Sequence, residues 1–291
     1  MRFTSLLALS CVLMLSLSAC STFGKSDEEA QAQSDKVIEK IKDQKDQANA
    51  DTVEAMYNRA AAKMDAGEYS MAAQLFDDVE REYPYSSWAT RAQLMAGYAH
   101  YRDLKYDDAL LALDRFIQLH PGDESIDYAY YLKSLCYYEQ ISDVRRDQKM
   151  TELALDSLIQ VTERFPETRY ARDASLKIDL TLDHLAGKEM EIGRYYLIRK
   201  QYQAAINRFQ LVVKDYQTTT HVPEALHRLT ETYLALGIRP EAEKTAAVLG
   251  HNYPSSQWYR DSYTLLTGQT LDEGAAPKKK SIYDKTIGRI F

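Results

Sequence analysis

The sequence predicts an all-α fold, a solenoid of about five stacked helix pairs, because one spaced pattern recurs along the chain. The pattern is a Tyr, a small residue three positions later, an apolar residue four after that and a Pro eight beyond it. It is typical of the second helix of a two-helix repeat, which the Pro ends because it lacks an N–H donor. The copies are Tyr69, Ala72, Phe76 and Pro84; Tyr106, Ala109, Leu113 and Pro121; Thr151, Ala154, Leu158 and Pro166; Tyr202, Ala205 and Phe209; and Ala242, Ala246 and Pro254.

Residues at three other fixed distances from the Tyr position also repeat from copy to copy. Small residues stand nine positions before the Tyr position, where two antiparallel helices must cross closely: Ala60, Gly97, Ser142, Gly193 and Thr230. Apolar residues stand ten positions after it, at Val79, Phe116, Val161, Val212 and Leu249. Bulky rings precede the terminating position, at Tyr83, His120, Phe165, Tyr216 and Tyr253. A helical bundle with chance similarity is the alternative, but the agreement of these positions favours tetratricopeptide repeats (TPR). Such repeats stack into a binding surface.

The pattern also predicts how the chain is divided. One repeat domain is expected over residues 51–268, with a long helical stretch from Arg169 to Lys200 that is broken or bent near Gly187. This stretch is expected to separate three N-terminal units from a C-terminal pair. The units are expected near residues 52–84, 86–121, 125–166, 188–217 and 222–254.

The N-terminus predicts a lipoprotein signal over residues 1–19. Its apolar run, residues 6–17, is too short to span a bilayer and leads into Leu17-Ser18-Ala19-Cys20, which matches a bacterial lipobox. Lipidation of Cys20 would anchor the chain, and Ser21 in place of an Asp favours the outer membrane. An uncleaved or ordinary secretory signal is the alternative. Polar residues 20–50 are expected to form a tether from the lipid.

Composition excludes several other functions. The net charge of −7 offers no broad basic field for nucleic acid. No HExxH, glycine-rich phosphate loop or GxSxG motif is present, so we expect no catalytic residue, no metal site, no cofactor and no enzyme activity.

Cys136 in an apolar helix is interpreted as a small core residue rather than a reactive thiol. Residues 269–291 are interpreted as a linker and a C-terminal tail, either amphipathic and docked or solvated.

Several segments are more specific than a generic repeat. They are Arg115-Phe116-Ile117-Gln118-Leu119-His120-Pro121, Ile126-Asp127-Tyr128-Ala129-Tyr130-Tyr131, Arg164-Phe165-Pro166-Glu167-Thr168-Arg169-Tyr170, Tyr195-Tyr196 and Ala205-Ile206-Asn207-Arg208. With the lipobox, these segments make the chain resemble the BamD family, the lipoprotein subunits of the bacterial outer-membrane β-barrel assembly (Bam) machinery. The resemblance covers essentially all of residues 52–265. It departs at residues 142–147, where the family carries a longer insertion, and after Gly268.

The resemblance implies a non-enzymatic scaffold on the periplasmic face of the cell outer membrane, held there by its lipid. Its implied partners are the periplasmic (POTRA) domain of the barrel-forming BamA subunit, other Bam lipoproteins and unfolded outer-membrane proteins. Arg208 stands where the family places an arginine that pairs with an acidic residue of BamA. A guanidinium suits that role because it binds carboxylates bidentately and stays charged. An intramolecular pair with an Asp or Glu of its own helix is the alternative for Arg208.

Tyrosines mark a second candidate surface. Tyr98, Tyr101, Tyr128 and Tyr131 fall on the expected first helices of units two and three, which line the concave face in this architecture. Tyr offers apolar area with a polar tip, so these residues are candidates for a groove that holds client segments. The alternative is that the rings pack between helices. Two other functions stay open at this point, coordination of envelope constriction by a TPR protein and the role of a secretin pilotin.

Overall fold

The computed structural model describes residue 40 and residues 53–271. Cys20, the tail at residues 278–291 and all of the predicted tether except residue 40 lie outside the described residues. Within the described part of the chain every regular element is a helix, the first at residues 53–65. The others are α2 (Tyr69–Glu82), α3 (Ser87–Arg102), α4 (Tyr106–Leu119), α5 (Ile126–Tyr138), α6 (Lys149–Arg164), α7 (Arg169–Ile198), α8 (Tyr202–Asp215), α9 (Val222–Ala235), α10 (Arg239–Asn252) and α11 (Gln257–Thr267).

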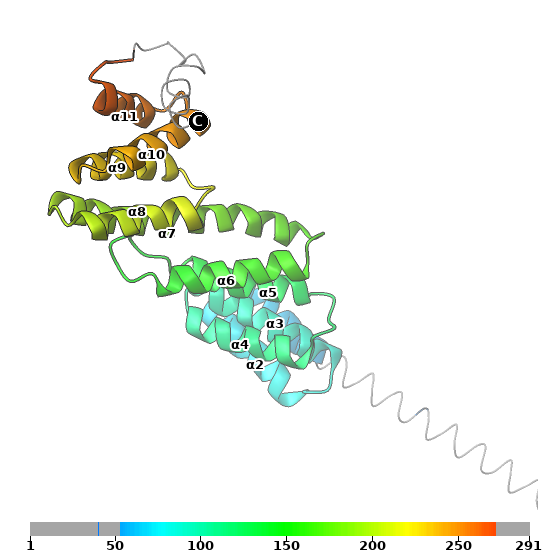
Figure 1. Cartoon of the computed structure of the whole chain (residues 1–291). Coiled ribbons are helices and arrows are strands. Elements are labelled where there is room, and N and C mark those ends of the chain that lie inside the picture. The colour runs from blue at the N-terminus through cyan, green and yellow to red at the C-terminus, as the bar shows by residue number, and fades with distance from the viewer. Residues whose placement is uncertain (1–39, 41–52, 272–291) are drawn as a thin grey trace, which may run out of the picture. The chain divides into compact units, whose positions relative to one another are not determined.

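The chain forms two compact units, and the division falls between Met95 and Ala96, inside α3. In the first unit Phe76 is fully buried and Tyr57 packs on it and on Trp88, with ring centroids 5.3 and 5.0 Å apart. In the second unit each helix from α4 to α11 packs on its neighbours in the chain, and α11 also packs on α9. The core of this unit therefore lies between successive helices, as in a solenoid (Figure 1).

The small and apolar positions of the repeated sequence pattern are buried residues of the second helix in each pair. All five small positions are 0% exposed, and so are all five apolar positions four residues later. The small residues nine positions before the Tyr position lie on the first helices, where the two helices of a pair come close together. A Cβ on Gly193 would lie 2.4 Å from Cε1 of Phe209, and a Cβ on Gly97 would lie 3.0 Å from Leu113. The predicted all-α TPR solenoid is confirmed. The boundaries of the domain and its units stay predictions.

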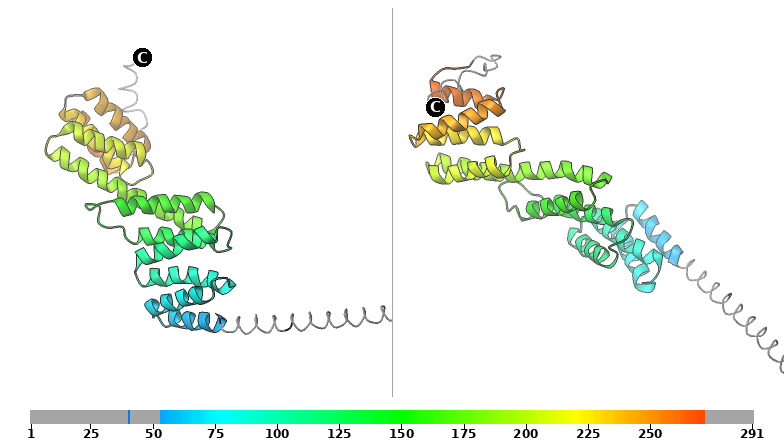
Figure 2. Two further views of the ribbon diagram at one scale, coloured as in Figure 1. Left: turned by 90° about the horizontal axis from the view of Figure 1, so that it is seen from below. Right: turned by 45° about the vertical axis from the view of Figure 1, so that its right-hand side comes forward.

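The helix is not broken near Gly187, because α7 is one uninterrupted helix of 30 residues (Figure 2). Its start is capped by the Thr168 hydroxyl, which accepts a hydrogen bond from the Ala171 N–H. Gly187 is buried, and a Cβ there would lie 3.2 Å from Nε2 of His221 and 3.4 Å from Val144. The glycine therefore allows close packing of α7 against two other segments.

The turn inside several helix pairs has a fixed backbone geometry that sequence reasoning missed. The residue two positions before the second helix has a positive φ in four pairs: Gly67 (76°), Leu104 (60°), Lys200 (59°) and Gly237 (76°). A left-handed residue after a helix redirects the chain and lets the terminal carbonyls find donors. Leu104 and Lys200 adopt this conformation without the freedom of glycine. Among the described residues, no helix has the length and apolar composition needed to cross a bilayer.

Candidate functional site

Four tyrosine rings from three helices are linked by successive ring contacts and are here called the tyrosine strip. Tyr98 of α3 lies 6.4 Å from Tyr128 of α5, centroid to centroid. Tyr128 lies 5.4 Å from Tyr170 at the start of α7, and Tyr170 stacks on Tyr131 of α5 at 5.1 Å. All four side chains are half-buried. The helices thus cover part of each ring and leave the remainder at the surface.

Hydroxyl groups and guanidinium groups border the strip. Tyr131 donates a hydrogen bond to the carboxylate of Asp173 on α7. Nη1 of Arg102 donates to the Tyr98 hydroxyl at 2.9 Å, and Nη2 of Arg169 donates to the Tyr170 hydroxyl at 2.8 Å. Both guanidinium groups also lie over those rings, at 5.8 and 4.8 Å. The strip therefore offers apolar ring faces with hydrogen-bonding edges.

The surroundings of two strip residues, Tyr128 and Tyr131, raise the pKa of their phenols. Burial raises the pKa of Tyr128 and of Tyr131, and the hydrogen bond to Asp173 raises the pKa of Tyr131 further. The same hydrogen bond is the main reason that the pKa of Asp173 is lowered, with Lys177 adding to it. These two phenols therefore remain neutral at physiological pH.

Three of the four predicted groove tyrosines belong to the strip, and Tyr101 does not. Tyr101 packs on Tyr106 at 6.0 Å, and its hydroxyl points to Glu139 at 3.5 Å. Burial and the Glu139 charge raise the pKa of Tyr101 to about 12. Tyr170 was missed because the repeat pattern assigns it only to the start of a new helix. Its position four residues after Pro166, where a first helix faces the previous unit, could have suggested it.

Arg208 lies on α8 and pairs within the chain. Its Nη1 donates to Oε2 of Glu189 on α7 at 2.9 Å. The side chain of Glu189 is only 16% exposed, whereas that of Arg208 is 41% exposed. The alternative of a partner on its own helix is wrong, since the carboxylate comes from the neighbouring helix. Arg208 makes no second hydrogen bond within the described residues, so its other N–H groups face water or a partner.

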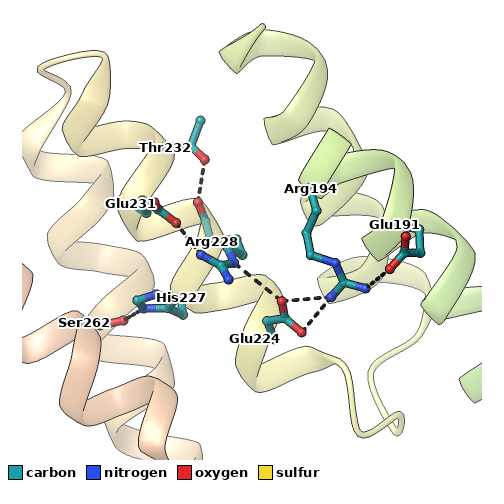
Figure 3. A network of polar contacts seen from close by, with 8 residues as sticks. All are labelled: Glu191, Arg194, Glu224, His227, Arg228, Glu231, Thr232 and Ser262. Carbon is teal, nitrogen blue, oxygen red and sulfur yellow. Dashed lines mark hydrogen bonds and ion pairs between the residues drawn. The ribbon is translucent and has the colours of Figure 1, made fainter. Parts of the chain in front are cut away.

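A network of ion pairs joins α7 to α9 beside this region (Figure 3). Nη1 of Arg194 lies 2.9 Å from both carboxylate oxygens of Glu224, and its Nη2 donates to Glu191 at 2.7 Å. Nε of Arg228 approaches Glu224 at 3.5 Å, and its Nη1 donates to Glu231 at 2.8 Å. The hydrogen bond from Arg194 holds the pKa of Glu191 below its usual value. Partly buried, multiply bonded pairs of this kind fix the relative position of two helices.

The helix α9 is also tied to α11. Nδ1 of His227 is 2.9 Å from the hydroxyl of Ser262, and the His227 ring lies 5.2 Å from Trp258 (Figure 3). Burial lowers the pKa of His227, so the ring is neutral. Cys136 is fully buried and burial raises its pKa to about 12, which confirms its interpretation as a core residue. The described residues contain no group of three or more His, Cys, Asp or Glu side chains that could hold a metal ion.

The chain is similar to a family of outer membrane lipoproteins. The family model described as "YfiO: Outer membrane lipoprotein" matches residues 49–249. A protein of Caulobacter vibrioides named "Outer membrane protein assembly factor BamD" is 49% identical over 239 residues, which are 82% of this chain and 78% of that protein. Proteins of the same name from Rickettsia prowazekii and Neisseria meningitidis serogroup A are 48% and 34% identical, covering 74% and 84% of this chain and 85% and 90% of theirs.

Two solved structures are also similar. A thermophilic TPR protein of Thermus thermophilus aligns with a TM-score of 0.35 and 20% identity, over 75% of this chain and 100% of that one. The TPR domain of P58(IPK) aligns with a TM-score of 0.39 and 12% identity, over 83% of this chain and 65% of that one.

Proposed function

This chain belongs to the BamD family of outer membrane lipoproteins, and we propose that it is a non-enzymatic scaffold of outer-membrane protein assembly. In this role it binds the periplasmic domain of the barrel-forming BamA subunit and unfolded β-barrel clients. Lipidation of Cys20 holds it on the periplasmic face of the outer membrane, where other Bam lipoproteins join the complex. Similarity at 49% identity to an assembly factor over 82% of the chain supports this role.

The tyrosine strip is the observation that carries the client-binding part of the proposal. An unfolded outer-membrane protein presents extended segments in which apolar and aromatic side chains alternate with polar ones. Half-exposed Tyr rings supply apolar contact area at a low cost in side-chain entropy, and their hydroxyl groups bond the polar backbone of an extended chain. Tyr98, Tyr128, Tyr170 and Tyr131 contact one another in that order, so rings from three helices form one aromatic surface that a client segment can contact.

The BamA part of the proposal uses Arg208. Its guanidinium is held at one nitrogen by Glu189 and keeps its remaining N–H groups available to a carboxylate of the partner. The exposed fraction of 41% leaves room for that contact. A charge-assisted, bidentate bond at this place gives both strength and orientation to an interface.

The test is a pull-down of BamA and of unfolded client peptides with two variants of the full chain. Arg208→Glu is expected to abolish association with BamA by placing two carboxylates together, and unchanged association would show that Arg208 is not in the interface. Tyr98→Ala combined with Tyr131→Ala is expected to weaken client binding while circular dichroism stays the same. Loss of helicity in that variant would show that the rings are core residues. Tyr85→Ala is the control, because Tyr85 is fully exposed and lies outside the strip.

Membership of the assembly-factor family gives no specific support to the two alternative functions, coordination of envelope constriction and the role of a secretin pilotin. Depletion of the protein separates all three by phenotype. Assembly predicts loss of many outer-membrane barrels, a role in envelope constriction predicts chained cells, and a pilotin role predicts loss of one secretin.

A further inference from the structure

Three helix ends of the second unit lie at one end of its C-terminal helices: the end of α7, the turn between α9 and α10, and the end of α11. The α7–α8 and α9–α10 turns lie at the same end in Figures 1 and 2. Nη2 of Arg239, at the start of α10, donates to the Leu266 carbonyl at 3.0 Å, which holds the end of α11 beside that turn. Residues 195–200, 236–239 and 265–266 are here called the turn edge.

The turn edge exposes large apolar side chains. Ile198 is 82% exposed, Leu265 is 50% exposed, and Leu236 and Ile238 are 41% and 42% exposed. The ring of Tyr195 is also about half exposed, at 51%. Single exposed apolar residues are ordinary on a protein surface, but several of them at one end of a helix stack indicate a contact surface.

The charged side chains of the turn edge are all cations. The guanidinium of Arg199 lies 4.4 Å from the ring centroid of Tyr195, and Arg239 is paired with Glu243 at 2.9 Å. Within residues 53–271 the side chains of Arg199 and Lys200 form no hydrogen bond or ion pair. These two side chains are therefore positive charges without a counter-charge, and they directly follow the most exposed apolar residue of the edge.

The turn between α3 and α4 differs from the turn edge in its charge. Leu104 is 71% exposed and is followed by Lys105, so the sequence of the turn is similar. Nζ of Lys105, however, lies 2.8 Å from the carboxylate of Asp103. The cation of that turn is paired, whereas the turn edge keeps cations that attract anions.

We propose that the turn edge lies against the anionic phospholipid surface of the outer membrane, with Ile198 and Ile238 entering the boundary between headgroups and acyl chains and Arg199 and Lys200 on lipid phosphates. The inference rests on the proposed anchoring through Cys20 and adds a second contact to it. A member of a family of outer membrane lipoproteins is held beside such a surface. Exposed aliphatic side chains and cations together are what binds proteins to an anionic bilayer surface. Two contacts would fix the orientation of the helices to the membrane.

The test is co-sedimentation of the full chain with vesicles of phosphatidylcholine, alone or mixed with phosphatidylglycerol. The chain carries Cys20→Ser, so that no acyl chain binds it to the bilayer. Arg199→Glu combined with Lys200→Glu is expected to weaken binding to the anionic vesicles about tenfold or more at low salt and much less at high salt. Ile198→Ser combined with Ile238→Ser is expected to weaken it about threefold or more at both salt concentrations.

Each pair of substitutions has a matched control. Arg91→Glu combined with Arg172→Glu changes the net charge equally at two exposed cations outside the turn edge, and Arg91, like Arg199, lies over an aromatic ring. Leu176→Ser combined with Leu180→Ser removes two leucines of the first half of α7 that are 66% and 61% exposed. All the substituted side chains are exposed, and circular dichroism of each variant checks that the helices are retained.

The outcomes separate the turn edge from other sources of binding. If the turn-edge variants bind the vesicles as their controls do, the inference is overturned, and the cationic tail at residues 278–291 carries whatever binding the parent shows. If they bind the vesicles normally but weaken the pull-down of BamA, the edge is a protein interface and the membrane contact is overturned. Loss of binding in the charge variant alone overturns the apolar part of the contact. The proposed function fails separately, in the pull-downs with the Arg208 and tyrosine variants.

Discussion

The two halves of α7 differ in how they contact the rest of the second unit. Residues 169–185 contact α5 through the ring of Tyr170 and the carboxylate of Asp173. Residues 186–198 bury Gly187 and Gly193 against other segments and carry the ion pairs to α8 and α9. One helix thus supports an aromatic surface at its start and a charged, closely packed surface further along.

The difference matters for what each half can bind. Ring stacking and apolar contact are non-directional, so the first half tolerates ligands of varied sequence. Close packing around glycine and multiply bonded ion pairs have narrow geometric tolerance, so the second half suits one fixed partner. This contrast predicts that substitutions in the second half cost more stability than those in the first.

The largest effect is expected from Gly193→Ala in the second half. The new Cβ would lie 2.4 Å from Cε1 of the fully buried Phe209, and neither the ring nor the helix can move without disturbing the core. We expect a loss of about 2 kcal/mol or more in the free energy of unfolding, typical of overpacking. Thermal and urea unfolding measure it. Gly122→Ala is the control, because nothing lies within 4 Å of a Cβ there. Equal stability of the two variants would contradict close packing at this crossing.

A smaller loss is expected from Glu224→Gln. The Glu224 side chain is 14% exposed and accepts from Arg194 at 2.9 Å, so the neutral amide leaves that partly buried guanidinium without its main counter-charge. We expect a loss of about 1–2 kcal/mol, mostly from the charge left without compensation. Urea unfolding measures it, with Glu167→Gln at an exposed position as the control. A change no larger than the control's would show that the network of Figure 3 contributes little to joining α7 and α9.

The smallest effect is expected from Tyr131→Phe in the first half. The ring keeps its stacking on Tyr170, and only the hydrogen bond to Asp173 is lost, which costs about 1 kcal/mol or less. Because this bond lowers the pKa of Asp173 below its usual value of 3.8, it stabilises the fold above that pH, and its contribution disappears as the pH falls through the lower folded value. In the variant the pKa of Asp173 should rise towards 3.8, measured by an NMR titration of its carboxyl.

The control for this titration is Tyr137→Phe, since the Tyr137 hydroxyl has no hydrogen-bond partner within the described residues. An unchanged pKa of Asp173 in Tyr131→Phe would mean that Lys177 alone sets it. A loss of stability as large as that of Gly193→Ala would remove the contrast between the halves of α7.

The repeat pattern predicted the helices and the core well because each repeat buries the same positions, such as Ala109, Leu113 and Phe116, against its own partner helix. Contacts made by residues outside the repeated positions were harder to predict. Arg208 and Glu189 are 19 residues apart, and Tyr170 and Tyr131 are 39 apart, so their meeting depends on helix lengths and crossing angles. The role of Gly187 could not be predicted from the sequence either, because it depends on His221 and Val144, which pack on it.

The burial of Cys136 has a practical consequence for studying this molecule. It is the one cysteine within residues 53–271, it is fully inaccessible, and its thiol stays protonated because its pKa is raised to about 12. Thiolate, the species that reacts with maleimides and disulfides, is therefore scarce at this position. A cysteine introduced on the surface of the helical region can therefore be labelled or cross-linked selectively. Cys136 does not need to be replaced, because it does not react.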